Sequence, residues 1–145
     1  MVPSDRRPRR QRASKDPVAR ELGQAQAEIM NAFWERPEGA TVPELHADLN
    51  RRRGRKRSPA PAYTTVLTFV QRLHARGLLE REREGRGHRY RAALTRDELL
   101  AAWSDELIER LFADYGDLAV IRLDERLRGV DPEALAKLRE ARGGT

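Results

Sequence analysis

The 145-residue sequence predicts a mainly α-helical protein with one small β-hairpin in the middle of the chain. Three observations support this fold class. Apolar residues recur at helical spacing in several segments that capping residues, glycine or proline bound. One central segment instead alternates in polarity around two glycines, as hairpins do. That segment follows three expected helices and precedes two or three more, without an internal repeat.

The N-terminal segment is rich in arginine and proline and has almost no apolar anchor. It cannot bury enough surface to offset its ordering entropy, so we expect residues 1–21 to be a disordered basic tail. From Leu22 to Phe33 the apolar positions follow a helical spacing, which Pro37 and Gly39 end. This pattern predicts a first helix of about 13 residues.

Two further helices are expected before the hairpin. Thr41 and Glu44 have the spacing of a capping box, which predicts a short second helix. The third helix is expected between Pro61, which suits a helix start, and Gly77, which suits a C-cap. Its apolar stripe consists of Val66, Phe69, Val70 and Leu73.

The hairpin is expected in LLEREREGRGHRYRA, residues 78–92, where EGRG supplies the glycines of a tight reversal. A capping box at Thr95 then opens a long helix, which Gly116 interrupts. A further helix follows at 117–129, and Asp131 caps a last one.

Three helices followed by a hairpin form the winged helix-turn-helix arrangement. In that fold the second helix of the turn motif enters the major groove of DNA, and the hairpin lies along the flanking backbone. We therefore expect a winged-helix DNA-binding domain over residues 22–93 and a helical dimerisation domain over residues 94–145.

The net charge of +6 is strongly segregated along the chain. Residues 1–20, 51–57 and 58–93 carry +5, +6 and +4, whereas residues 21–50 and 94–145 carry −5 and −4. Such clustering favours a polyanion as partner, although a solvated basic loop is the alternative.

Candidate DNA contacts come from the third helix, the hairpin and the basic loop. Threonine and arginine can hydrogen-bond phosphates or base edges, and apolar side chains can contact thymine methyls. The third helix turns Thr64, Thr65, Leu67, Thr68 and Arg72 away from its apolar stripe. The alternative is that these are surface residues of an ordinary core helix. Candidate phosphate contacts are Arg86, His88 and Arg89 in the hairpin, and Arg51, Arg52, Arg53, Arg55, Lys56 and Arg57 in the loop.

The C-terminal half carries more apolar stripe than a small winged helix has free surface to cover. We therefore expect these residues to be buried between two copies in a homodimer. The expected interface residues are Leu99, Leu100, Trp103, Leu107, Leu111, Leu118, Ile121 and Leu127.

Composition argues against several other classes of protein. Without cysteine the chain has no disulfide, thiolate nucleophile or cysteine-ligated metal. The histidines lack metal-ligand spacing and the carboxylate pairs lack a nucleophile, so we expect no metal, no cofactor and no enzymatic activity. No apolar run reaches about 18 residues and no apolar leader begins the chain. We expect a cytoplasmic protein without membrane insertion.

The residues in combination resemble the penicillinase-repressor family, the BlaI/MecI/CopY group of bacterial winged-helix repressors. The resemblance begins at LGQAQAEIMNAFW, residues 22–34, and extends to the hairpin. The other matching positions are Thr64, Thr65, Val66, Thr68, Arg72, Leu73, Gly77, Glu84, Gly85, Arg86 and Tyr90.

The resemblance implies a homodimeric repressor on a palindromic operator, with interlocking C-terminal helices and a regulatory protease that cleaves the C-terminal region. Copper sensing is excluded because the cysteine cluster of that branch is absent. The chain departs from the family in a longer basic loop at 51–60. It also lacks the Asn–Phe pair associated with cleavage, where it has Glu109-Arg110-Leu111-Phe112. The alternative function is a basic RNA-binding or ribosome-associated structural protein, which has no need for two amphipathic C-terminal helices.

Overall fold

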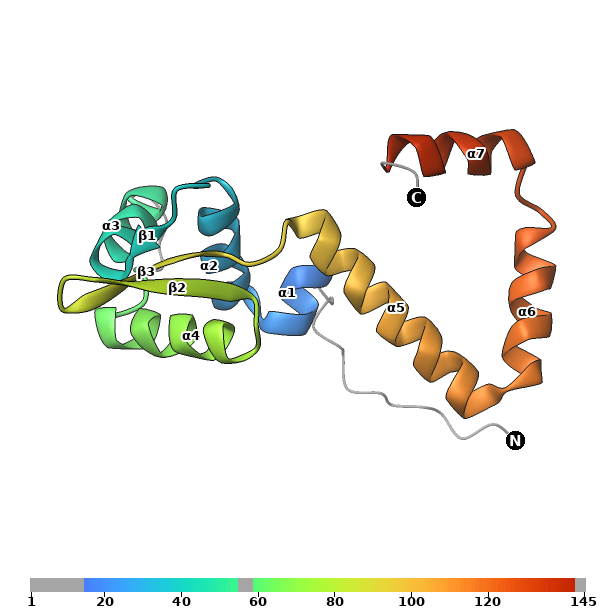
Figure 1. Ribbon diagram of the computed structural model, residues 1–145, viewed down its shortest axis with the longest axis horizontal. Coiled ribbons are helices and arrows are strands. Elements are labelled where there is room, and N and C mark those ends of the chain that lie inside the picture. The colour runs from blue at the N-terminus through green and yellow to red at the C-terminus, as the bar shows by residue number, and fades with distance from the viewer. Residues whose placement is uncertain (1–14, 55–58, 143–145) are drawn as a thin grey trace, which may run out of the picture. The chain divides into compact units, whose positions relative to one another are not determined.

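The computed structural model describes residues 15–54 and 59–142, and the chain forms two compact units (Figure 1). The first unit ends at Leu100 and the second begins at Ala101. The boundary lies later than the one expected after residue 93, because the start of the long helix belongs to the first unit. Trp34 donates a hydrogen bond of 2.9 Å to the Leu94 carbonyl, and Leu99 is buried.

Four helices form most of the first unit, namely α1 (Pro17–Leu22), α2 (Gln24–Trp34), α3 (Val42–Arg53) and α4 (Tyr63–Ala75). The three helices predicted for the winged-helix domain are confirmed as α2, α3 and α4. Their inward faces build one apolar core. Its largest fully buried side chains are Phe33, Ile29, Met30, Leu45, Leu73, Val18, Val66 and Val70.

Helix α1 lies within the segment that we expected to be a disordered tail. The Asp16 side chain accepts a hydrogen bond of 3.0 Å from the Val18 N–H, and Pro17 occupies the first turn. The Val18 side chain is fully buried. The tail prediction is therefore wrong for residues 17–21, because a capped turn and a buried valine outweigh the polar composition around them. Residues 1–14 lie outside the described part of the chain.

The expected caps of α3 and α4 are largely confirmed. Thr41 and Glu44 form both halves of a capping box at the start of α3. Helix α4 begins at Tyr63, two residues after Pro61, with no side-chain cap. At its end Gly77 has φ 78, and its N–H and that of Leu78 donate bonds of 3.0 Å to carbonyls of the last turn. This Schellman motif turns the chain into the hairpin.

The predicted hairpin is confirmed and gains a third strand. Strands β2 (Leu79–Glu84) and β3 (Gly87–Ala92) pair antiparallel across a two-residue turn, in which Gly85 has φ 60. A positive φ at the first turn position matches the twist of the flanking strands. Strand β1 (Ala40–Thr41) pairs with β3, giving the order β1-β3-β2. Two residues are too short to show alternation, so the sequence did not predict β1.

The second unit is helical, as predicted. Helix α5 (Arg96–Tyr115) begins in the first unit, where the Thr95 hydroxyl accepts a bond of 3.1 Å from the Glu98 N–H. Gly116, with φ 54, separates α5 from α6 (Asp117–Leu127), and α7 (Pro132–Ala141) follows. No described helix combines the length and the apolar content that a bilayer crossing requires.

Candidate nucleic-acid interface

Helix α4 presents a polar stripe on the side opposite the core. Val66, Val70 and Leu73 are fully buried, so the positions half a turn away face solvent. Three of the predicted recognition residues, Thr64, Thr68 and Arg72, are exposed there. The other two, Thr65 and Leu67, are half-buried at the edges of the stripe.

The same stripe includes Gln71, which the sequence analysis missed. At about 100° per residue Gln71 lies between Leu67 and Thr64 around the helix, so the spacing of the buried residues could have identified it. A glutamine amide can bond both hydrogen-bonding atoms of an adenine edge in the major groove. Gln71 is therefore a further candidate for base readout on this face.

Two contacts on α4 modify the predicted roles. Phe69, expected in the apolar stripe, is only half-buried, and the Arg72 guanidinium lies 5.8 Å from the centre of its ring. This cation–π contact orients Arg72 without using its hydrogen-bond donors. The Thr68 hydroxyl donates a bond of 2.9 Å to the Thr64 carbonyl, so it must rotate before it can donate to DNA.

The wing, meaning β2, β3 and their turn, has two faces of different charge. The strand register places Tyr90 on the same face as Arg81, Arg83 and His88. The Tyr90 ring lies 6.1 Å from the ring of His74 on α4, so this face turns toward α4. Strand β2 runs back alongside α4, which brings the wing turn to the end at which α4 begins (Figure 1).

The face of the wing that turns toward α4 is positively charged. Within the described part of the chain, Arg81, Arg83 and the turn residue Arg86 form no ion pair with a carboxylate, and all three are exposed. Arg86 was predicted as a phosphate contact, whereas Arg81 and Arg83 were missed. Their signal is the alternation in β2, which separates these arginines from the intervening glutamates.

The structure places Arg89, a predicted phosphate contact, apart from Arg86. It lies on the opposite face of the wing, where its guanidinium bonds the carboxylates of Glu44 and Glu84 at 3.0 to 3.2 Å. The hydrogen bond from Arg89 lowers the pKa of Glu44, and the bonds to Glu84 and then Glu44 raise the pKa of Arg89. In the free chain the Arg89 guanidinium is therefore occupied by two carboxylates.

The arginines at 51–53 also differ from their predicted place in a basic loop. They form the last turn of α3, where positive charge complements the helix dipole. Carboxylates compensate all three: Arg51 pairs with Asp48, Arg52 with Asp48 and Glu35, and Arg53 with Glu28. The bond to Glu35 raises the pKa of Arg52. The other predicted loop contacts, Arg55, Lys56 and Arg57, lie outside the described residues.

The three histidines each lie near a tyrosine ring. His46 is 5.7 Å from Tyr63, and both His74 and His88 are 6.1 Å from Tyr90, measured between ring centres. Across the described residues, no three side chains of metal-binding type come together. His88 is half-buried beside Arg83 on the wing, which leaves it a candidate for a phosphate contact.

Comparison with known proteins agrees with this geometry. The family model described as penicillinase repressor matches residues 22–141, which include the α4 stripe, the wing and the C-terminal helices. This chain belongs to the penicillinase-repressor family. Two proteins of Mycobacterium tuberculosis, from strains CDC 1551 / Oshkosh and ATCC 25618 / H37Rv, are each named transcriptional regulator BlaI. Each is 34% identical to this chain over 117 residues, which cover 80% of this chain and 80% of the relative.

The family assignment confirms the resemblance found in the sequence and the winged-helix fold. It also confirms that the chain belongs to a class of transcriptional regulators and not of enzymes. The match starts at Leu22, so it excludes most of α1.

The C-terminal helices of this penicillinase-repressor family member expose much apolar surface. Four predicted interface residues, Leu107, Leu118, Ile121 and Leu127, have exposed fractions of 55 to 62%. Leu100, Trp103 and Leu111 are half-buried. Leu99 is only 2% exposed, so the interface prediction is wrong for this residue, which belongs to the core of the first unit. Exposed apolar residues that the prediction missed are Ile108, Phe112, Tyr115, Val120, Val130 and Leu138.

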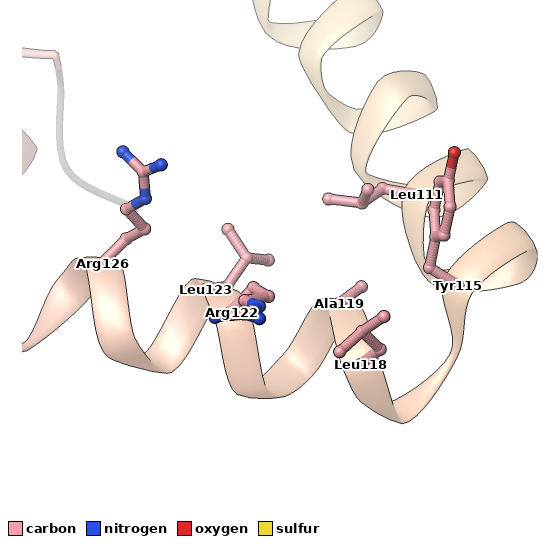
Figure 2. Close-up of a pocket in the computed structure, with 7 residues that line it drawn as sticks. All are labelled: Leu111, Tyr115, Leu118, Ala119, Arg122, Leu123 and Arg126. Carbon is pink, nitrogen blue, oxygen red and sulfur yellow. The ribbon is translucent and has the colours of Figure 1, made fainter. Parts of the chain in front are cut away.

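Part of this apolar surface is hollowed where α5 meets α6 (Figure 2). Leu111 and Tyr115 come from α5 and lie across a space of about 270 Å³ from side chains of α6. The lining from α6 consists of Leu118, Ala119, Arg122, Leu123 and Arg126. A concave apolar surface of this kind can receive side chains of another helix.

Proposed function

We propose that this chain is a transcriptional repressor that binds duplex DNA as a homodimer on a palindromic operator. The observation that supports this most strongly is the pairing of two surfaces in one unit. The exposed stripe of α4 carries groups that can bond base edges, and the adjoining face of the wing carries arginines that have no carboxylate partner among the described residues. This is the division of labour between base readout and phosphate contact in winged-helix proteins.

On α4, we assign base readout to Thr64, Thr68, Gln71 and Arg72. These four side chains lie on the exposed face of a helix whose opposite face is locked into the core. The helix can therefore enter the major groove without losing any buried contact. Thr65 and Leu67 are assigned to contacts at the groove edges, because the protein covers part of their surface.

On the wing, we assign phosphate contacts to Arg81, Arg83, Arg86 and His88. The charges of the three arginines are not compensated within the described chain, so these arginines provide the counterion release that drives binding to DNA. The glutamates of β2 would oppose this if they shared the face. The register instead places Glu80, Glu82 and Glu84 on the other face.

The homodimer is assigned to the exposed apolar residues of α5, α6 and α7. Among the described residues of the second unit, only Ala119 has less than a tenth of its surface exposed, so the unit has almost no core of its own. A second copy would cover this surface, and two linked DNA-binding units would bind a palindrome with an apparent affinity raised by about 10² to 10⁴-fold. Any signal that separates these helices, including cleavage by a protease, would lower operator affinity by the same factor.

Competition measurements test the proposal. An operator duplex can be obtained by selection of bound sequences from a random pool. Once labelled, it should be displaced by its unlabelled form at much lower concentration than by unrelated duplex or by RNA of the same length. Equal displacement by RNA would favour the RNA-binding alternative. A variant with aspartate at Leu118 and Ile121, both exposed in the single chain, should sediment as a monomer and lose the preference for a palindrome over a half-site. A variant that remains dimeric would refute the assigned interface.

A further inference from the structure

One guanidinium joins the wing to a segment of the winged helix that lies 45 to 50 residues earlier in the sequence. The Arg89 side chain on β3 donates to the Gly39 carbonyl at 3.2 Å and to both carboxylate oxygens of Glu44 at 3.0 and 3.2 Å. It also bonds Glu84 at 3.1 and 3.2 Å. Gly39 lies in the turn before β1, Glu44 in the first turn of α3, and Glu84 next to the wing turn. We call Arg89, Glu44 and Gly39 the wing clasp.

Other contacts fix the backbone around Glu44 and Gly39 in place. Glu44 also accepts a bond of 3.2 Å from the Thr41 N–H as half of the α3 capping box. A Cβ at Gly39 would clash with the Tyr90 carbonyl, so the turn and β3 are in close backbone contact. The Arg89 side chain is 21% exposed, less than its two carboxylate partners. Bidentate arginine–carboxylate bonds fix orientation as well as distance.

We propose that Arg89 is a positioning residue that fixes the wing against α3 through Glu44 and Gly39, so that the wing arginines meet the DNA backbone. The inference rests on the proposed function for its consequence in DNA binding. The alternative is that Arg89 leaves Glu44 and contacts a phosphate itself. The two roles predict opposite effects for removal of the Glu44 charge.

The variants Arg89→Met and Glu44→Gln test the clasp. Methionine keeps an unbranched apolar stem, and glutamine keeps the second half of the capping box while removing the charge. The matched controls are Arg91→Met and Glu82→Gln. Arg91 and Glu82 form an ion pair of 3.0 Å on the same face, but both lie within the hairpin and do not tie it to α3.

Affinity for a labelled duplex of random sequence is the first readout, because wing contacts to phosphates do not depend on sequence. The clasp predicts that Glu44→Gln and Arg89→Met each bind about fivefold more weakly than their controls, and that the double variant loses no more than either single one. Tighter binding by Glu44→Gln than by Glu82→Gln would overturn the proposal, because it would mean that Arg89 had been freed to contact phosphate. Additive losses in the double variant would also overturn it.

Amide hydrogen exchange of the wing in the free protein is the second readout, and it does not involve DNA. Exchange at the wing tip should accelerate in Glu44→Gln and Arg89→Met and stay at the wild-type rate in the controls. Unchanged exchange in both clasp variants would overturn the proposal. If the wild-type chain bound no duplex while the clasp variants still loosened the wing, the proposed function would fail and the positioning role would stand.

Discussion

Neutralising the wing arginines should change the salt dependence of DNA binding by an amount that the structure specifies. Arg81, Arg83 and Arg86 are three exposed cations without carboxylate partners in the described chain. Each phosphate contact contributes about 0.9 to the slope of log affinity against log salt concentration. Replacing all three with glutamine should therefore reduce the slope by about 2.7 per protomer, and by about 5.4 for a bound dimer.

The arginines at the end of α3 provide the matched control. Replacing Arg51, Arg52 and Arg53 with glutamine removes the same charge, yet these side chains are already paired with Asp48, Glu35 and Glu28. A cation whose partner is a carboxylate of the same protein does not neutralise a phosphate, so it releases no counterion from the DNA. The control should therefore leave the slope near the wild-type value.

Fluorescence anisotropy titrations of one labelled duplex at several salt concentrations would measure both slopes, with circular dichroism to confirm that each variant is folded. The assignment of phosphate contacts to the wing would be refuted if the α3 variant lost as much slope as the wing variant. The same result would return the phosphate contacts to the segment at 51–57, where the charge pattern of the sequence had placed them.

Three further predictions concern single residues. Replacing Gln71 or Thr68 with alanine should cost about 1–3 kcal/mol at particular operator bases and little on random duplex, as a panel of single-base operator variants would show; equal losses on both would make them phosphate contacts. Leu99→Ala should lower the free energy of unfolding, measured with urea, by about 2–5 kcal/mol without weakening the dimer. Leu107→Ala should instead weaken the dimer, measured by sedimentation, without lowering the free energy of unfolding. The pKa of Glu44 is lowered in the folded chain, so its charge stabilises the fold above the ordinary glutamate range and this contribution is lost as pH falls through the folded pKa. The stability difference between wild type and Glu44→Gln should thus be constant near neutral pH and disappear as the pH falls below the lowered pKa of Glu44, and a difference that grew on acidification would contradict this.

The sequence was sufficient for the elements that have a regular period or a capping signal. The buried stripe of α4 follows from a spacing of three and four residues, and the hairpin follows from alternation around two glycines. Elements too short to show a repeating pattern of apolar residues were not predicted. Strand β1 has two residues and α1 has six, so neither shows a repeat, although Asp16 and Pro17 mark the start of α1.

The candidate site was predicted less completely. The sequence shows how charged residues follow one another along the chain, but not which of them form ion pairs in the fold. The basic segment looked unpaired, yet Arg52 and Arg53 meet carboxylates that lie 17 and 25 residues earlier. Arg89 meets Glu44 from 45 residues away. Such pairs depend on tertiary contacts that no local pattern reveals. The roles of Arg81 and Arg83 needed only the strand register, which the hairpin turn already determines.

Selection of bound duplexes from a random pool by the wild-type chain tests most directly whether α4 and the wing form a DNA-reading surface in a dimer. The recovered sequences should share an inverted repeat, with half-sites about one helical turn apart or a multiple of it. The same selection with alanine at Thr64, Thr68 and Gln71 should recover duplexes without that repeat. A wild-type pool with no common motif, or a motif that survives the triple substitution unchanged, would contradict the account.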